Sequence, residues 1–337
     1  MINFGIKFIM YDFINLLGGI SLFLYGLTLV ADSTKSLTEG KNGKIVSGLC
    51  KRPIGGLLTG TVVSAITQSS VAVNFIAVEM VQERVLNFYS AAAVIMGANI
   101  GTTATAQLIS AVGLKSGVIG SIVAIIGLLL GFFKNKSIKN LSGATFGLGV
   151  LFAGFSQMQQ GAKGLASYGW FTKLLLVKNP FALFLVGMLF TAITQSSSAL
   201  TGLIVVLANC KLLDFSSAAY LTLGSNVGSC FSVVLLSLGK KVEARQTAVF
   251  NLAFNLLGSA LIFPLVYFFG DGLTLLLASG KTVGKAIADF HTLFNLTCAV
   301  IFLPFLKVFT LAIKRLVKDK QPSAQNQVVK GKGIIQY

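Results

Sequence analysis

Charged side chains are scarce in this sequence. Only 11% of the 337 residues are Asp, Glu, Lys or Arg, whereas 54% are hydrophobic. A soluble domain carries about 25% charged residues, so a surface this poor in charge would not stay in water. Several apolar stretches reach the ~20 residues that a helix needs to cross a bilayer. We therefore predict an all-α integral membrane protein with the lipid bilayer as a partner.

Histidine and acidic side chains are also scarce. The chain has one histidine, His291, and 10 Asp and Glu against 27 Lys and Arg. The basic residues lie between apolar spans without interleaved aromatic residues, which indicates the positive-inside bias of membrane proteins and no nucleic-acid partner. The converging base, nucleophile or metal ligands of an intramembrane enzyme are missing, so we predict no enzyme. The four cysteines are scattered and are interpreted as free thiols: Cys50, Cys210, Cys230 and Cys298.

The sequence contains an internal repeat. Residues 51–110 match residues 178–237 at 22 of 60 positions without a gap, where chance in this composition gives roughly 5. The identities include the polar run Thr-Gln-Ser-Ser, which starts at Thr67 and again at Thr194. Hydrophobic bias does not explain matches of this kind, so the sequence indicates a duplication.

Each copy contains a pattern typical of a re-entrant helical hairpin. In the first copy, two apolar pieces of about 12–15 residues flank Gln-Ser-Ser, and each is too short to cross a bilayer alone. We therefore predict hairpins at residues 53–82 and 180–208, with their tips at membrane depth.

Each copy also contains a segment that we predict to be a discontinuous transmembrane helix. Residues 88–112 and 215–238 are long enough to cross, but they contain Gly-x-Asn-x-Gly at residues 97–101 and 224–228. Paired Gly and Asn let the backbone leave helical geometry. Such irregular backbone is tolerated at membrane depth only where it is buried in protein or lines a cavity.

The distribution of Lys and Arg predicts the topology. Further spans are expected at residues 13–31, 115–133, 141–158, 247–269 and 286–306. In this arrangement one side holds 19 Lys and Arg and the other holds 8, which places the N-terminus outside and the C-terminus in the cytoplasm of a multi-pass protein of the cell inner (plasma) membrane. Each unit has three crossings and one hairpin, so the second copy is inverted. The predicted parts are repeat 1 (13–133), repeat 2 (141–269), an extra transmembrane helix (286–306) and a basic cytoplasmic tail (307–337).

Inverted repeats with broken helices place a transport site near the midplane, where the repeats meet. Helix N-termini favour anions, and carbonyl and hydroxyl oxygens suit Na⁺. Lys and Arg are absent from the interior of the hairpins and broken helices. A bound anion must therefore be balanced by helix dipoles and co-bound cations, so that the two bind reciprocally.

The doubled motif resembles the type II sodium–phosphate cotransporter family. The resemblance covers about residues 13–306 and rests on Thr67-Gln68-Ser69-Ser70, Gly97-Ala98-Asn99-Ile100-Gly101-Thr102-Thr103, Thr194-Gln195-Ser196-Ser197-Ser198 and Gly224-Ser225-Asn226-Val227-Gly228-Ser229. It implies import of inorganic phosphate by alternating access, with Na⁺ as the coupling ion, no other metal and no cofactor.

The resemblance also implies the site residues. Those expected to bind phosphate are Gln68, Ser69, Ser70, Asn99, Gly101, Thr102, Thr103, Gln195, Ser196, Ser197, Asn226, Gly228 and Ser229. Those expected to bind sodium are Thr67, Gln68, Ser69, Asn99, Thr194, Gln195, Ser196, Ser198 and Asn226. Two departures from the family pattern, Val71 in repeat 1 and Ser229-Cys230 in repeat 2, bear on the number or affinity of sodium ions.

Several alternatives stay open at this stage. A carrier of another small anion, such as sulfate or a dicarboxylate, coupled to sodium or protons, would use the same architecture. A structural or signalling role would leave the polar tips unexplained. Glu79, Asp289 and His291 lie in or near predicted membrane segments, where an ionisable group is a candidate for function. The motif around His291, residues 290–295, is echoed at residues 250–255 on the preceding span. Sodium stoichiometry and a homo-oligomeric state are equally open.

Overall fold

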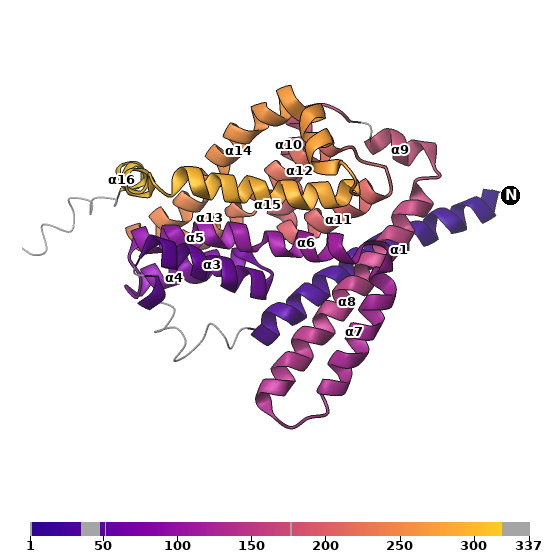
Figure 1. Ribbon diagram of the computed structural model, residues 1–337, viewed down its shortest axis with the longest axis horizontal. Coiled ribbons are helices and arrows are strands. Elements are labelled where there is room, and N and C mark those ends of the chain that lie inside the picture. The colour runs from indigo at the N-terminus through magenta and orange to yellow at the C-terminus, as the bar shows by residue number, and fades with distance from the viewer. Residues whose placement is uncertain (1, 35–47, 51, 176, 319–337) are drawn as a thin grey trace, which may run out of the picture.

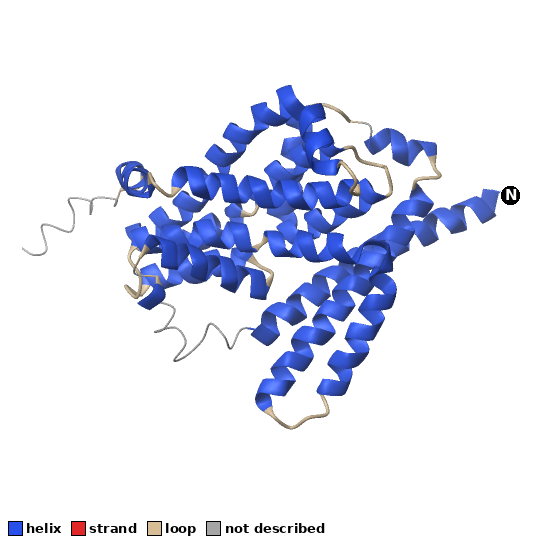
Figure 2. Cartoon of the chain, in the orientation of Figure 1, coloured by secondary structure: helices blue, strands red, loops and turns tan. Residues whose placement is uncertain are grey.

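The computed structural model describes residues 2–34, 48–50, 52–175 and 177–318. All regular structure in this part of the chain is helical (Figure 2). The helices of the first copy are α3 (Pro53–Thr67), α4 (Ser70–Gln82), α5 (Phe88–Gly101) and α6 (Thr103–Val112), and those of the second are α10 (Pro180–Thr194), α11 (Ser197–Asn209), α12 (Phe215–Gly228) and α13 (Cys230–Ser237). The others are α1 (Ile2–Thr34), α7 (Ser116–Leu130), α8 (Lys136–Leu165), α9 (Gly169–Leu175), α14 (Val242–Ala278), α15 (Val283–Phe302) and α16 (Leu306–Leu316), with a 3₁₀ turn η2 (Gly113–Lys115).

Six helical segments among the described residues are long and apolar enough to cross a membrane. They are Lys7–Thr34, Phe88–Val112, Lys136–Leu165, Phe215–Ser237, Val242–Ala278 and Val283–Phe302. The helices α3, α4, α10 and α11 have 13 to 15 residues each, which at 1.5 Å per residue falls short of a ~30 Å hydrocarbon core.

The internal repeat extends to local structure. Helices α10 to α13 begin at the positions that the repeat aligns with the first residues of α3 to α6, in the same order. The N-caps correspond as well: Ser69 and Ser196 accept from the backbone N–H three residues on, both at 3.2 Å. Asn87 and Asp214 do the same for α5 and α12. Each cap satisfies a backbone donor that the first helical turn would otherwise leave unpaired.

The Gly-x-Asn-x-Gly segments do not behave as the sequence predicted. Residues 97–101 and 224–228 are helical and form the last turns of α5 and α12. Thr102 and Ser229, which separate these helices from the next ones, keep right-handed helical φ and ψ (−61°, −23° and −62°, −20°). The prediction that the backbone leaves helical geometry within these segments is therefore wrong.

The glycines of this motif instead allow two helices to touch. A Cβ on Gly97 would lie 1.9 Å from the carbonyl oxygen of Leu57 in α3, and one on Gly224 would lie 1.9 Å from that of Phe184 in α10. Both distances are far inside van der Waals contact. The physical reason for Gly at these positions is thus the close approach of α5 to α3 and of α12 to α10.

Helices α14 and α15 join the repeats at equivalent points. The backbone N–H of Lys241, at the start of α14, donates to Gln82 Oε1 at 2.9 Å. The backbone N–H of Gly284, in the first turn of α15, donates to Asn209 Oδ1 at 3.2 Å. Because Gln82 and Asn209 are repeat-related ends of α4 and α11, each hairpin-like pair is tied to the helix that packs beside it.

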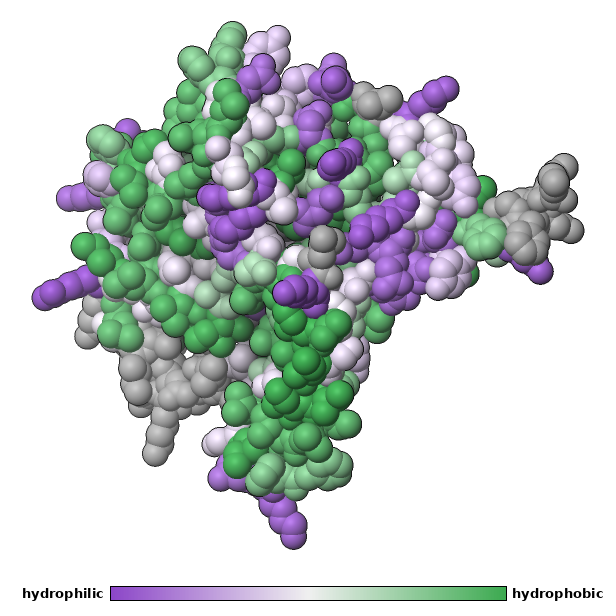
Figure 3. Space-filling model, turned by 45° about the vertical axis from the view of Figure 1, so that its right-hand side comes forward, coloured by the Kyte–Doolittle hydropathy of each residue, from purple (hydrophilic) through white to green (hydrophobic). Residues whose placement is uncertain are grey.

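Helices α1, α7 and α8 form an arm that extends from the rest of the molecule (Figure 1). Glycines let α1 and α8 pack backbone to backbone: a Cβ on Gly26 would lie 2.5 Å from the amide nitrogen of Leu151. The lower projection in Figure 3, formed by α7 and α8, is largely hydrophobic along its sides and hydrophilic at its end. Exposed apolar side chains line α7, among them Val118, Ile122 and Ile125. Such a surface suits lipid better than water.

Two further segments differ from the sequence-based expectation. The residues from 307 onward were predicted to be a basic tail, but α16 covers residues 306–316 and buries Leu306 and Ile313. Its burial depends on contacts with α5 and α14, which the sequence does not reveal. Residues 319–337 of that tail lie outside the described residues. Helix α14 is also longer than the span 247–269 and is kinked, with non-helical φ and ψ at Phe269, which follows Pro264 by little more than one turn.

Candidate functional site

Each Gln-Ser-Ser sequence forms a tight turn between two short helices. Turn 1 is Gln68, Ser69 and Ser70, and turn 2 is Gln195, Ser196 and Ser197. Gln68 and Gln195 both have φ 55° and ψ 22°, the left-handed conformation that closes the preceding helix. In a residue other than glycine this conformation costs roughly 1–2 kcal/mol. The same conformation occurs at a second repeat-related pair, Arg84 and Lys211, both with φ 60°, so it belongs to the duplicated backbone geometry.

Both turns line one cavity of about 260 Å³. The lining residues are Thr67, Gln68, Ser69, Ser70 and Val71 of the first copy, Thr194, Gln195, Ser196, Ser197 and Ser198 of the second, and Leu24, Leu27, Thr28 and Ala31 of α1. At ~30 Å³ per water molecule, the volume is enough for a small ion with part of its hydration shell. The cavity thus unites two equivalent segments of the repeat that are far apart in the chain.

A residue next to turn 2 contacts turn 1. The hydroxyl of Ser198, the second residue of α11, donates to the backbone carbonyl of Gln68 at 3.4 Å. This contact joins the beginning of a helix in the second copy to the turn of the first. The hydrogen bond links the two copies beside the cavity.

The turns differ in how firmly they are held. The Gln68 side chain is buried, donates to the carbonyl of Ala65 and accepts from the Thr105 hydroxyl of α6 at 2.8 Å. The equivalent Gln195 is exposed, as is Thr194. Turn 1 is thus fixed against α6, whereas turn 2 presents its glutamine to the surroundings.

The Gly-x-Asn-x-Gly residues lie apart from the cavity lining. Asn99 and Asn226 are buried, and their Nδ2 atoms donate to the carbonyls of Ile95 and Thr222 at 2.9 and 2.8 Å. The predicted site residues that do not line the cavity are Asn99, Gly101, Thr102, Thr103, Asn226, Gly228 and Ser229. The predicted site residues of the turns and their flanks, from 67 to 70 and from 194 to 198, all do.

The cavity is lined by uncharged residues. Its lining contains hydroxyl, amide and backbone groups and no Asp, Glu, Lys or Arg among the described residues. Hydroxyls and amides supply both donors for an anion and oxygen acceptors for a hard cation. The cavity can therefore hold an anion and a cation together, but it offers no fixed charge to hold either one alone.

The contributions of α1 and α6 to the cavity and its turns are not evident from the sequence. Four residues of α1 complete the cavity wall, and Thr105 holds Gln68. The α1 residues precede the matched segment, so the repeat gave no signal for them. Thr105 matches Ser232 in the second copy, and this shared hydroxyl was the only available signal.

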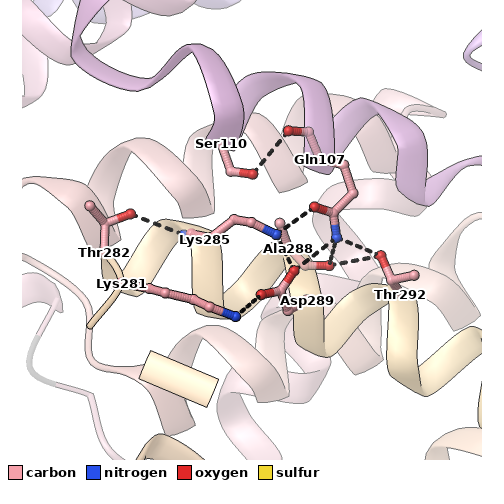
Figure 4. A network of polar contacts seen from close by, with 8 residues as sticks. All are labelled: Gln107, Ser110, Lys281, Thr282, Lys285, Ala288, Asp289 and Thr292. Carbon is pink, nitrogen blue, oxygen red and sulfur yellow. Dashed lines mark hydrogen bonds and ion pairs between the residues drawn. The ribbon is translucent and has the colours of Figure 1, made fainter. Parts of the chain in front are cut away.

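The two acidic candidates are paired with lysines. Glu79 Oε1 lies 2.7 Å from Lys240 Nζ, a link between α4 and the segment after α13. Asp289 of α15 pairs with Lys281 at 2.9 Å and with Lys285, as Figure 4 shows. Gln107 of α6 joins this network, since its Nε2 donates to Asp289 Oδ1 at 3.2 Å and its Oε1 accepts from Lys285 at 2.8 Å. Asp289 therefore bridges α15 to α6.

Comparison with known proteins identifies relatives of the whole chain. The family profile described as Na⁺/Pi-cotransporter matches residues 22–160 and 169–297. YqeW of Bacillus subtilis (strain 168) is 29% identical over 303 residues, which is 89% of this chain and 97% of YqeW. YjbB of Escherichia coli (strain K12), named for inorganic phosphate export, is 22% identical over 324 residues, 95% of this chain and 58% of YjbB.

A further relative matches only part of this chain. The sodium-dependent phosphate transport protein 2A of Rattus norvegicus is 34% identical over 96 residues, which is 27% of this chain and 15% of that protein. The chain thus spans little more than half of YjbB and a small part of the rat protein. No solved structure matches this chain.

Proposed function

The chain belongs to the Na⁺/Pi-cotransporter family, and we propose that it imports inorganic phosphate across the cell inner (plasma) membrane by sodium-coupled alternating access. It is a multi-pass membrane protein of a family of transporters, not of enzymes. The observation that carries the proposal is the neutral cavity lined by both turns. A site shared by two repeats is the usual arrangement in secondary transporters.

Sodium coupling follows from the charge of the cavity. A phosphate ion among neutral hydroxyls and amides lacks a counter-charge, and removing it from water is costly unless its charge is compensated. Sodium ions bound beside it supply that charge, and by linkage phosphate strengthens sodium binding equally. Coupling then needs no titratable side chain in the lining, which agrees with the residues present.

The two turns are proposed to make the direct contacts. Phosphate is assigned to the donors of turns 1 and 2, and sodium to the oxygens of the same turns and of Thr67, Thr194 and Ser198. The residues behind the lining, namely Asn99, Gly101, Thr102, Thr103, Asn226, Gly228 and Ser229, are proposed to position the turns. Support comes from the buried side chains of Asn99 and Asn226 and from the close helix contacts at their flanking glycines.

The proposed topology has inverted repeats. The helix pairs α3–α4 and α10–α11 are proposed to be re-entrant from opposite sides, with the N-terminus outside and the C-terminus in the cytoplasm. Repeat 1 (13–133) and repeat 2 (141–269) then form the carrier, α15 the additional crossing and the residues after it a cytoplasmic tail. The short lengths of these paired helices and the 19-to-8 division of Lys and Arg support this arrangement.

The test is uptake of radiolabelled phosphate into proteoliposomes with an imposed sodium gradient. We expect accumulation with sodium outside and potassium inside, and none in liposomes without protein. Competition by unlabelled sulfate or a dicarboxylate would assign the carrier to another anion. Equal uptake with potassium on both sides would reject sodium coupling.

Export is the second candidate for direction, because the relative YjbB is named for it. The same vesicles, loaded with labelled phosphate, separate the two directions. Release of labelled phosphate from the vesicles while the sodium gradient points inward would indicate export. Accumulation of labelled phosphate inside the vesicles, driven by the same gradient, indicates import.

A further inference from the structure

A second group of polar side chains lies buried outside the cavity. This asparagine cluster comprises Asn74 of α4, Asn226 of α12, Asn251 and Asn255 of α14, and His291 and Asn295 of α15. Each is at most 3% exposed, and none lines the cavity of the turns. Six polar side chains from four helices at this depth need a physical reason, because burial of a polar group without a partner is unfavourable.

Direct contacts connect the cluster. Asn251 Oδ1 accepts from Asn74 Nδ2 at 3.2 Å and from Asn255 Nδ2 at 3.1 Å. His291 Nε2 lies 3.4 Å from Asn226 Oδ1. The thiol of Cys230 lies between these two groups, 3.5 Å from the carbonyl oxygen of Asn251 and 3.4 Å from that of Asn226.

The contacts leave much of the cluster unsatisfied. Within the described part of the chain, Oδ1 of Asn74, Asn255 and Asn295 has no hydrogen-bond partner, and neither does Nδ1 of His291 nor Nδ2 of Asn251. A buried polar atom without a hydrogen-bond partner destabilises the folded state. Five of them in one connected region suggest a missing binding partner rather than scattered packing defects.

The chemistry of these atoms narrows the identity of the partner. Amide carbonyl oxygens are ligands for hard cations. Divalent cations are usually held by carboxylates, but none of the Asp or Glu residues in the described chain is buried. A cage of neutral oxygens is suited to a monovalent cation, as carbonyl-lined sites in channels illustrate.

We propose that the asparagine cluster is a second, interior binding site for a monovalent cation, with sodium as the physiological ion. The proposal builds on the sodium coupling proposed above and adds a site that the turns do not contain. Its ligands are the side-chain oxygens of the cluster that have no hydrogen-bond partner, Oδ1 of Asn74, Asn255 and Asn295.

The position of the site connects it to the cavity. Asn74 lies one helical turn after Ser70 of turn 1, so both are on one face of α4. The repeat aligns Asn74 with Thr201, so the cluster is not duplicated in the second copy. A cation held by these oxygens ties α4 to α14 and α15 and thereby holds turn 1 in place, whereas turn 2 has no equivalent cluster.

The test is a sodium titration of thermal stability on the purified full-length chain without phosphate. Sodium chloride replaces choline chloride at constant ionic strength, and the midpoint of the rise in Tm is measured. A ligand that binds only the folded state raises Tm with its concentration. Asn74→Leu and Asn255→Leu remove oxygens with little change in volume, and we expect each to raise the sodium midpoint at least tenfold.

Gln159→Leu is the matched control, because Gln159 is also buried and polar but lies in α8. Its sodium midpoint is expected to equal that of the unmodified chain. An unchanged midpoint in both leucine variants, or no saturable rise in the unmodified chain, would overturn the proposal.

The Asn255→Asp variant tests the same site if the leucine variants do not fold. A carboxylate adds negative charge where the cation sits, so the sodium midpoint is expected to fall at pH 8. If the cluster holds only water, this variant is less stable at every sodium concentration and its midpoint does not fall. The titration is independent of uptake: sodium-independent uptake would reject the coupling, and a failed titration would reject only this second site.

Discussion

At the scale of single residues, the two turn glutamines are equivalent in sequence but differ in their surroundings. Gln68 and Gln195 share sequence context and backbone conformation, but Gln68 is bonded to Thr105 and Gln195 is exposed. The same motif is therefore seen once in a packed turn and once in an open one.

The difference predicts unlike consequences for two equivalent substitutions. Gln68→Ala leaves the Thr105 hydroxyl without its buried acceptor, so we expect a loss of about 1–3 kcal/mol in stability together with loss of phosphate uptake. Gln195→Ala removes an exposed side chain, so we expect loss of uptake with a Tm within about 2 °C of the unmodified chain. Uptake should be normalised to folded protein measured by size-exclusion chromatography.

Thr105→Val is the control for the first of these variants. It breaks the same hydrogen bond but keeps the glutamine, so stability should fall while residual uptake per folded molecule remains. Near-normal uptake in both glutamine variants would remove the turns from the site.

At the scale of elements, helix contacts through glycine determine the shape of each repeat. Gly60 in α3 and Gly97 in α5 each face a backbone carbonyl of the other helix, and Gly187 and Gly224 do the same for α10 and α12. The two helices of each pair therefore lie at backbone contact, which leaves no room for any side chain between them.

Alanine at these glycines is expected to force the helices apart. The Cβ of Gly97→Ala or Gly224→Ala would overlap a carbonyl oxygen at 1.9 Å, so we expect each variant to lose at least about 1–3 kcal/mol. Gly272→Ala is the control, because nothing lies within 4 Å of its added Cβ and the helical position favours Ala by up to about 1 kcal/mol. Melting curves in detergent compare the three, and equal Tm values for all of them would contradict the packing role.

Some features of these elements are predictable from the sequence and others are not. Short apolar segments around a polar turn predicted helices near those observed, because length and hydropathy are local properties. The role of Gly97 was wrongly interpreted, since a glycine that permits unwinding and a glycine that permits contact look alike in one sequence. Asn74 and Thr105 were not singled out either, because their partners, Asn251 and Gln68, are 177 and 37 residues away.

At the scale of the whole molecule, the arm formed by α1, α7 and α8 adjoins the cavity through α1. The arm packs mainly within itself, yet α1 contributes a wall of the cavity between the two turns. The exposed tip between α7 and α8 includes Lys134 and Lys136, at the end of an otherwise apolar surface. This pattern suits an arm embedded in lipid with its basic end at a membrane surface.

Cysteine accessibility tests the proposed inversion. In a background without the four natural cysteines, Ser69→Cys should react with a membrane-impermeant thiol reagent from the cytoplasm and Ser196→Cys from outside, in opposite conformations. Lys134→Cys, in the predicted cytoplasmic loop, calibrates the inner side. If both serine positions react from one side only, whether or not sodium and phosphate are present, the inverted topology is wrong.

The central claim is that the two turns form one neutral site where phosphate is held with the help of sodium. Equilibrium binding of radiolabelled phosphate to the purified chain, in sodium and in potassium at equal ionic strength, tests it most directly. We expect saturable binding in sodium, at least tenfold weaker binding in potassium, and weak binding by the Gln195→Ala variant in both salts. Equal affinity in the two salts, with Gln195→Ala unaffected, would contradict it.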